Sequence, residues 1–178
     1  MTVEQAAEGD RVRSDATLTA FVAEHYDRLL GLARLVCRDT ADAADAVQVG
    51  LEQAWRRRAT LHDETRLRPW LDRIVIREAV RVRKNRQSWL SRMFASRPDI
   101  TWIEPADRRA SEPSTFAALR AAFAHLSPEQ RAVVALHLHL GYTITETAAI
   151  VGVPEETARS RLRLAKQRLR RELEESRS

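Results

Sequence analysis

The clearest chemical pattern in this sequence is a pair of strongly basic stretches. Between Arg159 and Arg171 there are seven bases and no acid, and between Arg66 and Arg97 the bases far outnumber the two acids. Arginine and lysine neutralise phosphates, and arginine can also pair with the acceptor atoms of guanine. One such stretch alone would fit a solvated helix face equally well. Because there are two, each on a predicted helix, the pattern favours binding to nucleic acid.

The C-terminal basic stretch lies within a predicted helix-turn-helix, residues 143–169. Thr143 and Glu146 have the spacing of a capping box that opens a short helix, and Gly152 can adopt the left-handed backbone that the turn needs. Pro154 suits the start of the following helix. Ala148 and Ala149 are expected to be the small residues at the helix crossing. The apolar residues expected to face inward are Val153, Ala158 and Leu162.

In a helix-turn-helix, the N-terminal half of the second helix reaches base edges in the major groove. The residues expected to contact DNA there are Glu155, Glu156, Thr157, Arg159, Ser160 and Arg163. The glutamates can accept hydrogen bonds from cytosine, or can simply interact with the helix dipole. A plain helical hairpin is the alternative interpretation, but the capping box, the proline and the acid-free basic stretch together favour DNA binding.

The elements that position these residues are predicted to be helices throughout, because Ala, Leu, Arg and Glu dominate while Gly and Pro are scarce. Residues 1–15 lack periodicity and are expected to form a disordered tail. Apolar residues at helical spacing predict helices over residues 17–37, 40–58 and 65–85. These three helices are expected to form a small bundle spanning residues 16–86.

Each helix of this bundle is expected to bury one face. For the second helix the buried residues are predicted to be Ala44, Val47, Leu51 and Trp55, and for the third helix Leu67, Leu71, Ile74 and Val75. On another face of the third helix, four bases follow one another at helical spacing: Arg73, Arg77, Arg81 and Lys84. Trp70 could stack on a base, but its apolar surroundings favour a place in the core.

The remaining chain is expected to hold a linker and a second domain. Residues 87–113 contain three prolines and isolated aromatics, which is typical of a flexible linker. Trp89 and Trp102 either dock on a neighbouring domain or anchor the linker on a partner. Residues 114–175 are expected to form a four-helix domain that includes the helix-turn-helix, and Ser127-Pro-Glu-Gln is predicted to begin one of its helices.

Other classes of protein are disfavoured by the sequence. The single cysteine, Cys37, lies on an apolar helix face and is predicted to be a core residue. No apolar run is long enough to span a membrane and the N-terminus does not resemble a signal peptide, so a cytoplasmic protein is expected. The five histidines are dispersed, and neither a metal-ligand motif, a phosphate-binding loop nor a nucleophile motif is present. The sequence therefore predicts a protein without cofactor, metal or catalytic activity.

Several segments resemble one known family. Residues 126–134, 141–148 and 152–162 (LSPEQRAVV, GYTITETA and GVPEETARSRL) look like region 4 of the extracytoplasmic-function (ECF) sigma factors. Residues 45–48, 54–56 and 70–74 (DAVQ, AWR and WLDRI) look like region 2 of the same family. The resemblance covers both predicted domains and their order.

This resemblance implies a function and assigns roles to residues. The family binds core RNA polymerase and brings it to promoters. The second helix of region 2 docks on the polymerase, and the residues that this implies as polymerase contacts are Asp45, Gln48, Glu52, Gln53 and Arg56. The loop and third helix of region 2 read and open the minus-10 element. The residues that this implies as minus-10 contacts are His62, Arg66, Arg73, Arg77 and Arg81. The recognition helix of region 4 reads the minus-35 element. The resemblance also implies an anti-sigma factor as a partner.

The sequence departs from the family pattern at a few positions. After Gln48 the family usually has an acid, a small polar residue and an aromatic, whereas this chain has Val49, Gly50 and Leu51. In the third helix the family usually has Asn where Arg77 stands, and often Asp where Arg81 stands. The rival hypothesis is a helix-turn-helix regulator that does not replace the sigma subunit. The helical, basic N-terminal half disfavours it, because a response regulator would alternate strands with helices.

Overall fold

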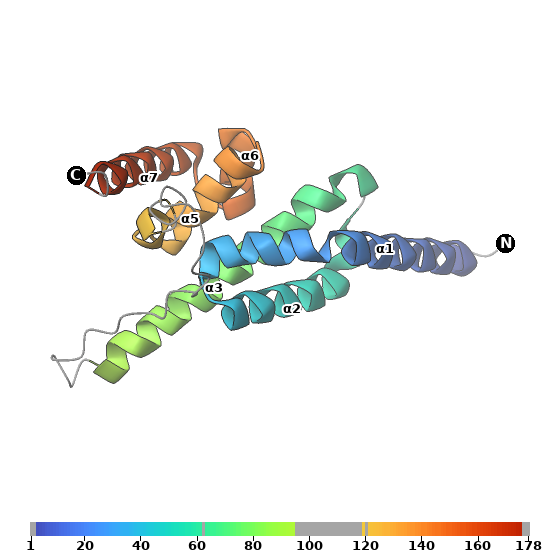
Figure 1. The fold of residues 1–178 in the computed structure, drawn as a ribbon. Coiled ribbons are helices and arrows are strands. Elements are labelled where there is room, and N and C mark those ends of the chain that lie inside the picture. Colours follow the sequence, from blue (N-terminus) through green and yellow to red (C-terminus); the bar gives the residue numbers. More distant parts are fainter. Residues whose placement is uncertain (1–2, 62, 95–118, 120, 176–178) are drawn as a thin grey trace.

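The computed structural model describes residues 3–61, 63–94, 119 and 121–175, and within these every regular element is helical. The N-terminal half holds three helices, α1 (Val3–Cys37), α2 (Thr40–Arg57) and α3 (Leu67–Phe94), which pack against one another (Figure 1). Short 3-10 turns at Arg58–Thr60 and Glu64–Arg66 connect α2 to α3. The expected three-helix bundle is therefore present.

Two of these helices extend beyond the expected bounds. Where a disordered tail was expected over residues 1–15, α1 already begins at Val3. Where the linker was expected to start at residue 87, α3 continues to Phe94, so that Trp89 lies on the helix with 51% of its surface exposed. Both extensions consist mainly of good helix formers without proline, so a helix continues there even without a regular apolar stripe. Trp102 lies outside the described residues.

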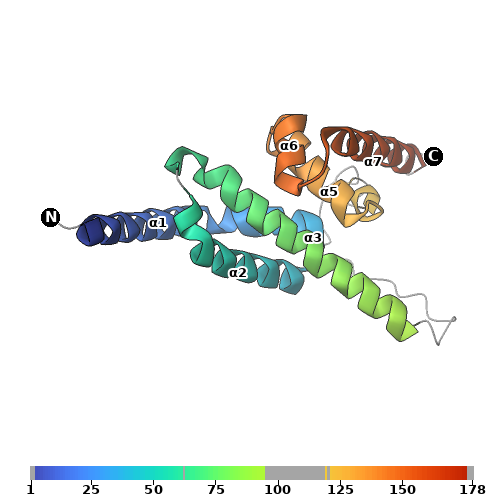
Figure 2. The same cartoon turned by 180° about the vertical axis from the view of Figure 1, so that it is seen from behind.

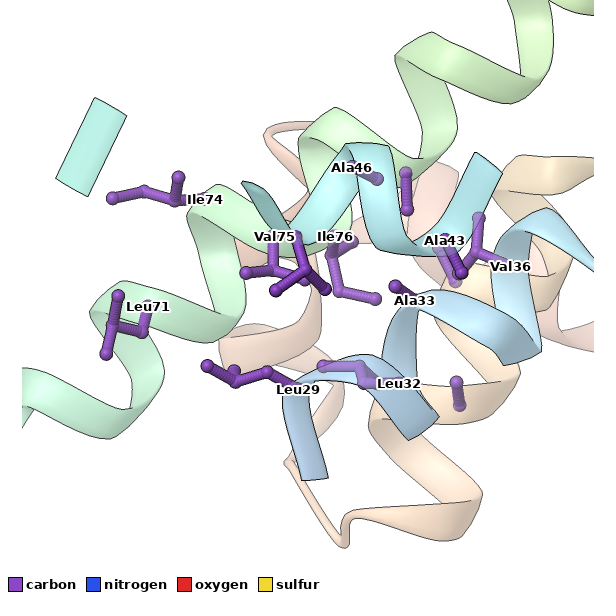
Figure 3. Packing of buried hydrophobic residues seen from close by; sticks show 14 of the residues in the cluster. Leu29, Leu32, Ala33, Val36, Ala43, Ala46, Leu71, Ile74, Val75 and Ile76 are labelled. Carbon is purple, nitrogen blue, oxygen red and sulfur yellow. The ribbon is translucent and has the colours of Figure 1, made fainter. Parts of the chain in front are cut away.

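The core of the bundle is built from one face of each helix (Figure 3). On α3 the expected residues Leu67, Leu71, Ile74 and Val75 are buried, joined by Ile76 and Ala79. On α2 the buried face is rotated from the expected one and consists of small residues: Ala43, Ala46, Val47, Gly50 and Ala54.

The difference between the expected and the observed buried face of α2 is clearest at Trp55. The prediction that Trp55 is buried is wrong: 43% of the residue is exposed, and the Arg58 guanidinium lies 5.1 Å from its ring centroid. A Cβ on Gly50 would lie only 3.3 Å from Val75 Cγ2, so α2 and α3 approach too closely for large side chains between them. Trp70, by contrast, is half-buried against the core, as its apolar surroundings indicated.

The C-terminal half begins, within the described residues, with a helical turn at 121–124 and continues with α5 (Pro128–Val134), a π-helical turn (Ala135–His139), α6 (Ile144–Val151) and α7 (Glu155–Glu175). Both predicted capping boxes are confirmed. Ser127 accepts from the backbone of Gln130, and Thr143 accepts from the backbone of Glu146.

The two halves of the chain pack against each other. Helix α5 lies against α1 and α3, and α6 lies against α3, while α7 lies on the outer side (Figures 1 and 2). Residues of α5 and α6 are buried in the same apolar cluster as the three-helix bundle. None of the described helices is long and apolar enough to cross a membrane.

Candidate nucleic-acid interface

The helix-turn-helix is formed by α6, a tight turn and α7. Gly152 ends α6 with φ 76° and ψ 43°, the left-handed conformation expected from the sequence. Its N–H and that of Val153 both donate to the Ala148 carbonyl, at 2.8 and 3.1 Å. Ala148 and Ala158 are buried where α6 and α7 meet, whereas Ala149 is exposed, so only one of the two expected small residues lies at this crossing.

The N-terminal half of α7 presents the residues predicted to contact DNA. Glu156, Arg159 and Arg163 are exposed, and Glu155, Thr157 and Ser160 are half-exposed. The bases that follow on this helix extend the positive surface toward its C-terminal end. An exposed row of arginines that starts at a helix N-terminus can contact both base edges and phosphates.

Glu155 connects the two helices of the motif. Its carboxylate accepts hydrogen bonds from Arg159 and from the Thr145 hydroxyl, the latter at 2.8 Å. The hydrogen bond from Arg159, followed by that from Thr145, lowers the pKa of Glu155 below its ordinary value. Glu155 therefore orients Arg159 in the DNA-free protein. Thr145 could not be identified from the sequence, because its contact with Glu155 spans a turn and leaves no periodic signal.

A second basic surface lies at the first turns of α3 and the 3-10 turn before it. Arg66 and Arg73 are exposed and line a cavity of about 610 Å³, together with Trp70 from α3 and Glu146, Ala149 and Ile150 from α6. Basic side chains beside an aromatic ring are suited to single-stranded nucleic acid. His62, which was predicted to belong to this site, lies outside the described residues.

The other two predicted bases of α3 make contacts within the protein. Arg81 pairs with Glu78, at 2.6 Å between Nη2 and Oε2. Arg77 reaches away from its own helix and donates from Nε to the Ile150 carbonyl of α6 at 3.1 Å. Of the four arginines predicted for this site, Arg66 and Arg73 therefore face the cavity, whereas Arg77 and Arg81 form contacts within the protein.

A mixed-charge surface runs along α2. The side chains of Asp45, Gln48, Glu52 and Arg56 are exposed and recur at helical spacing, so they share one face. Gln53, expected on the same surface, instead donates from its amide to Glu78 Oε1 on α3 at 2.8 Å. Four of the five residues predicted to contact polymerase thus lie together, and Gln53 lies in the contact between α2 and α3.

Cys37 does not add a reactive thiol to these surfaces. The Cys37 thiol is buried and lies 3.5 Å from the Ala79 carbonyl, and burial, followed by the charge of Asp42, raises its pKa to about 12. This confirms the prediction of a core cysteine. Among the described residues, no group of three or more His, Cys, Asp or Glu side chains is arranged to hold a metal ion.

These features define a class: an all-helical DNA-binding protein that carries a helix-turn-helix and a second basic helical surface. Comparison with known families makes the class specific. Residues 21–89 match the family model for Sigma-70 region 2, and residues 116–169 match that for Sigma-70, region 4.

Similar proteins align with most of the length of this chain. The ECF RNA polymerase sigma factor SigM of Mycobacterium tuberculosis (strain ATCC 25618 / H37Rv) is 32% identical over 176 residues, covering 92% of this chain and 86% of the relative. The RNA polymerase sigma-E factor of Streptomyces coelicolor (strain ATCC BAA-471 / A3(2) / M145) is 30% identical, covering 86% and 84%. The chain belongs to the ECF RNA polymerase sigma factors, which confirms the resemblance found in the sequence.

Solved structures share the fold. The sigma factor RpoE of Bartonella quintana, in complex with the anti-sigma factor NepR, superposes with a TM-score of 0.64 at 22% identity, covering 88% of this chain and 96% of that one. CnrH in complex with the cytosolic domain of CnrY gives a TM-score of 0.56, also at 22% identity, covering 93% and 97%. The helical fold of this chain is thus shared by both solved structures.

Proposed function

We propose that this protein is an alternative sigma factor that binds core RNA polymerase and directs it to a set of promoters. The observation that carries the proposal is that one chain matches Sigma-70 region 2 and then region 4, and is similar to an ECF RNA polymerase sigma factor over 92% of its length. A helix-turn-helix regulator acting beside another sigma subunit would not need the region 2 bundle. The rival hypothesis is therefore not favoured.

Region 4, taken as residues 114–175, recognises the minus-35 element. The exposed residues Glu156, Arg159 and Arg163 support this role because they lie in the N-terminal half of α7, the part of a recognition helix that meets base edges. Glu155 positions Arg159 in this scheme, and Thr157 and Ser160 lie close enough on the same half to contact bases or phosphates. The following bases contact phosphates, so binding weakens steeply as salt rises.

Region 2, taken as residues 16–86, engages the minus-10 element. Opening a duplex requires cations for the phosphates and a surface on which unpaired bases can stack. Arg66 and Arg73 supply the charge beside Trp70, and His62, Arg77 and Arg81 complete the proposed set. The cavity lined by Arg66, Trp70 and Arg73 is the place where we expect a base of the opened strand to enter.

The α2 face formed by Asp45, Gln48, Glu52 and Arg56 contacts core polymerase. Its exposure and mixed charge support this role, because such a face can form several ion pairs across an interface. Gln53 contributes indirectly by holding α2 on α3 through Glu78. The proposed protein carries out no catalysis itself, works in the cytoplasm where transcription takes place, and has an anti-sigma factor as a regulatory partner.

Run-off transcription with purified core polymerase over a promoter library tests this function. We expect specific transcripts only when the protein is added, and the enriched promoters give its preferred sequence. Arg159→Ala with Arg163→Ala should reduce promoter binding, and Gln48→Ala with Arg56→Ala should reduce polymerase binding. If core polymerase neither binds the protein nor gains promoter-specific initiation from it, the proposal is wrong.

A further inference from the structure

Glu155 lies in the first turn of the recognition helix α7, and both of its carboxylate oxygens are engaged within the protein. Oε1 accepts from Nε of Arg159 at 3.1 Å and also from Nη2 of the same guanidinium. Oε2 accepts from the Thr145 hydroxyl at 2.8 Å. A carboxylate that is held at both oxygens is poorly placed to accept from a cytosine amino group, although the sequence allowed that role.

Thr145 makes this network different from an ordinary ion pair along one helix. Glu155 and Arg159 are four residues apart on α7, and an exposed pair at this spacing contributes little to stability. Thr145 belongs to the preceding helix, α6, so its hydroxyl reaches the carboxylate from across the turn. The carboxylate is thus held by both helices of the motif, and its position depends on how α6 and α7 are placed relative to each other.

The contact with Glu155 uses one edge of the Arg159 guanidinium and leaves another. Nε and Nη2 face Glu155, whereas the remaining N–H groups lie on Nη1 and Nη2, at the end of the side chain. This end carries two parallel N–H bonds, which is the arrangement that pairs with O6 and N7 of guanine in the major groove. The Arg159 side chain remains 59% exposed, so it is held in a form suited to guanine without being covered.

The same contact weakens the attraction of Arg159 to phosphates. Glu155 and Arg159 form an ion pair whose net charge is zero, and non-specific binding to the DNA backbone depends mainly on charge. A bidentate pair with guanine depends instead on directed hydrogen bonds. The pairing with Glu155 therefore favours the reading of a base over binding to the backbone.

We propose that Thr145 and Glu155 are positioning residues that hold Arg159 to read one guanine of the minus-35 element, and that Glu155 itself reads no base. This inference rests on the proposed role of region 4. Ordering a long side chain during binding lowers affinity, and the network orders Arg159 beforehand. A released Arg159 could turn to phosphates, which are the same at every base pair. Thr145 thereby acts on specificity through Glu155, without contacting DNA.

Binding selection with the holoenzyme tests the proposal. Full-length protein and purified core polymerase are mixed with a duplex promoter library that is randomised over the minus-35 positions, and the bound fraction is sequenced. Arg159→Ala should lose a preference for guanine at one base pair by about fivefold or more, which identifies the pair that Arg159 reads. Arg159→Lys keeps the charge but lacks the parallel N–H bonds, so it should lose the same preference.

Thr145→Val removes the hydroxyl and keeps the shape of an exposed side chain. We expect the guanine preference at that pair to fall roughly three- to tenfold, because Arg159 must then be ordered during binding. Thr145→Ser keeps a hydroxyl and should retain the preference of the parent, as should the control Thr19→Val, which alters an exposed threonine of α1. A merely structural role would lower the affinity for every promoter alike, without selecting one base pair.

Glu155→Gln removes the charge and keeps the shape. It should lower the same guanine preference while raising the affinity for a non-promoter duplex, because Arg159 is no longer neutralised. If the guanine preference survives both Thr145→Val and Glu155→Gln, the proposal is overturned. If Glu155→Gln instead abolishes a preference for cytosine at another base pair, Glu155 reads a base and the proposal is wrong.

A modified base tests the guanine contact itself. The analogue 7-deazaguanine lacks the N7 acceptor, so placing it at the pair read by Arg159 should weaken binding of the parent but not of Arg159→Ala. Equal effects on both proteins would overturn the assignment of Arg159 to guanine. A parent that selects promoters normally while the variants have no effect refutes only the positioning roles. A parent that neither binds core polymerase nor selects any sequence refutes the proposed sigma function, and this inference with it.

Discussion

Replacing each of two helical glycines by alanine should have opposite consequences, because their surroundings differ. Gly31 lies in α1 and Gly50 in α2. In a helix interior, alanine is favoured over glycine by about 1 kcal/mol, mainly because glycine loses more backbone freedom on folding. This gain applies to both positions, so any difference between the two variants reports what the new methyl group meets.

At Gly31 no atom lies within 4 Å of the new Cβ, and the full gain of about 1 kcal/mol should appear. At Gly50 the Cβ would lie 3.3 Å from Val75 Cγ2 and 3.5 Å from Val75 Cα. Val75 is fully buried and β-branched, so it cannot rotate away, and α2 and α3 must separate slightly. Overpacking of this kind costs about 1–3 kcal/mol, so Gly50→Ala should be neutral or destabilising by up to about 2 kcal/mol.

Urea unfolding followed by circular dichroism at neutral pH measures both free energies of unfolding. We expect Gly31→Ala to unfold at a higher urea concentration than the parent, with an unchanged slope, and Gly50→Ala at an equal or lower concentration. If Gly50→Ala stabilised the protein as much as Gly31→Ala, the close approach of α2 and α3 would not be the reason for glycine at position 50.

Three further outcomes are expected. Thr143→Ala should lower the free energy of unfolding by about 1 kcal/mol at pH 7, because the cap of α6 is lost. The hydrogen bonds from Thr143 lower the pKa of Glu146, so their contribution is present above the ordinary carboxyl pKa and is lost as the pH falls through the lower folded value. The difference between the urea midpoints of parent and variant should therefore shrink between about pH 5 and pH 3 but not vanish, because the Thr143 hydroxyl still accepts from the Glu146 N–H. Cys37, whose pKa burial raises to about 12, should react with a thiol reagent at pH 8 far more slowly in the folded protein than in urea, and equal rates would contradict its burial. Gln48→Ala with Arg56→Ala should weaken binding to core polymerase in a pull-down without DNA, while the isolated protein should bind duplex DNA as before. Unaltered polymerase binding would contradict the proposed role of the α2 face.

Local features of the fold could be predicted from the sequence because the atoms involved belong to neighbouring residues. A capping box joins a residue to one three positions later, so Thr143 with Glu146 is recognisable without any tertiary information. Gly152 marks its turn for the same reason, since the need for positive φ is a property of the local backbone. The family could be recognised because several such local patterns occur in a fixed order.

Other features of the candidate sites depended on tertiary packing. The face of α2 that is buried follows from the close approach at Gly50, and this approach leaves Trp55 exposed although its spacing indicated a core position. Gln53 lies at the correct spacing for the exposed face, yet its amide is held by Glu78 of the neighbouring helix. Periodicity identifies residues that could share a face, but the neighbouring helices decide which face is covered.

The helix-turn-helix and its basic recognition helix were therefore determined by the sequence alone, since caps, turn and charge all act over a few residues. The placement of region 4 on α3 was decided only by the tertiary structure. It depends on Arg77 reaching Ile150 and on Tyr142 reaching Asp72, contacts that span 73 and 70 residues. An arginine in a basic stretch looks the same in sequence whether it faces DNA or another helix, because its partner is chosen by the packing of segments far apart in the chain.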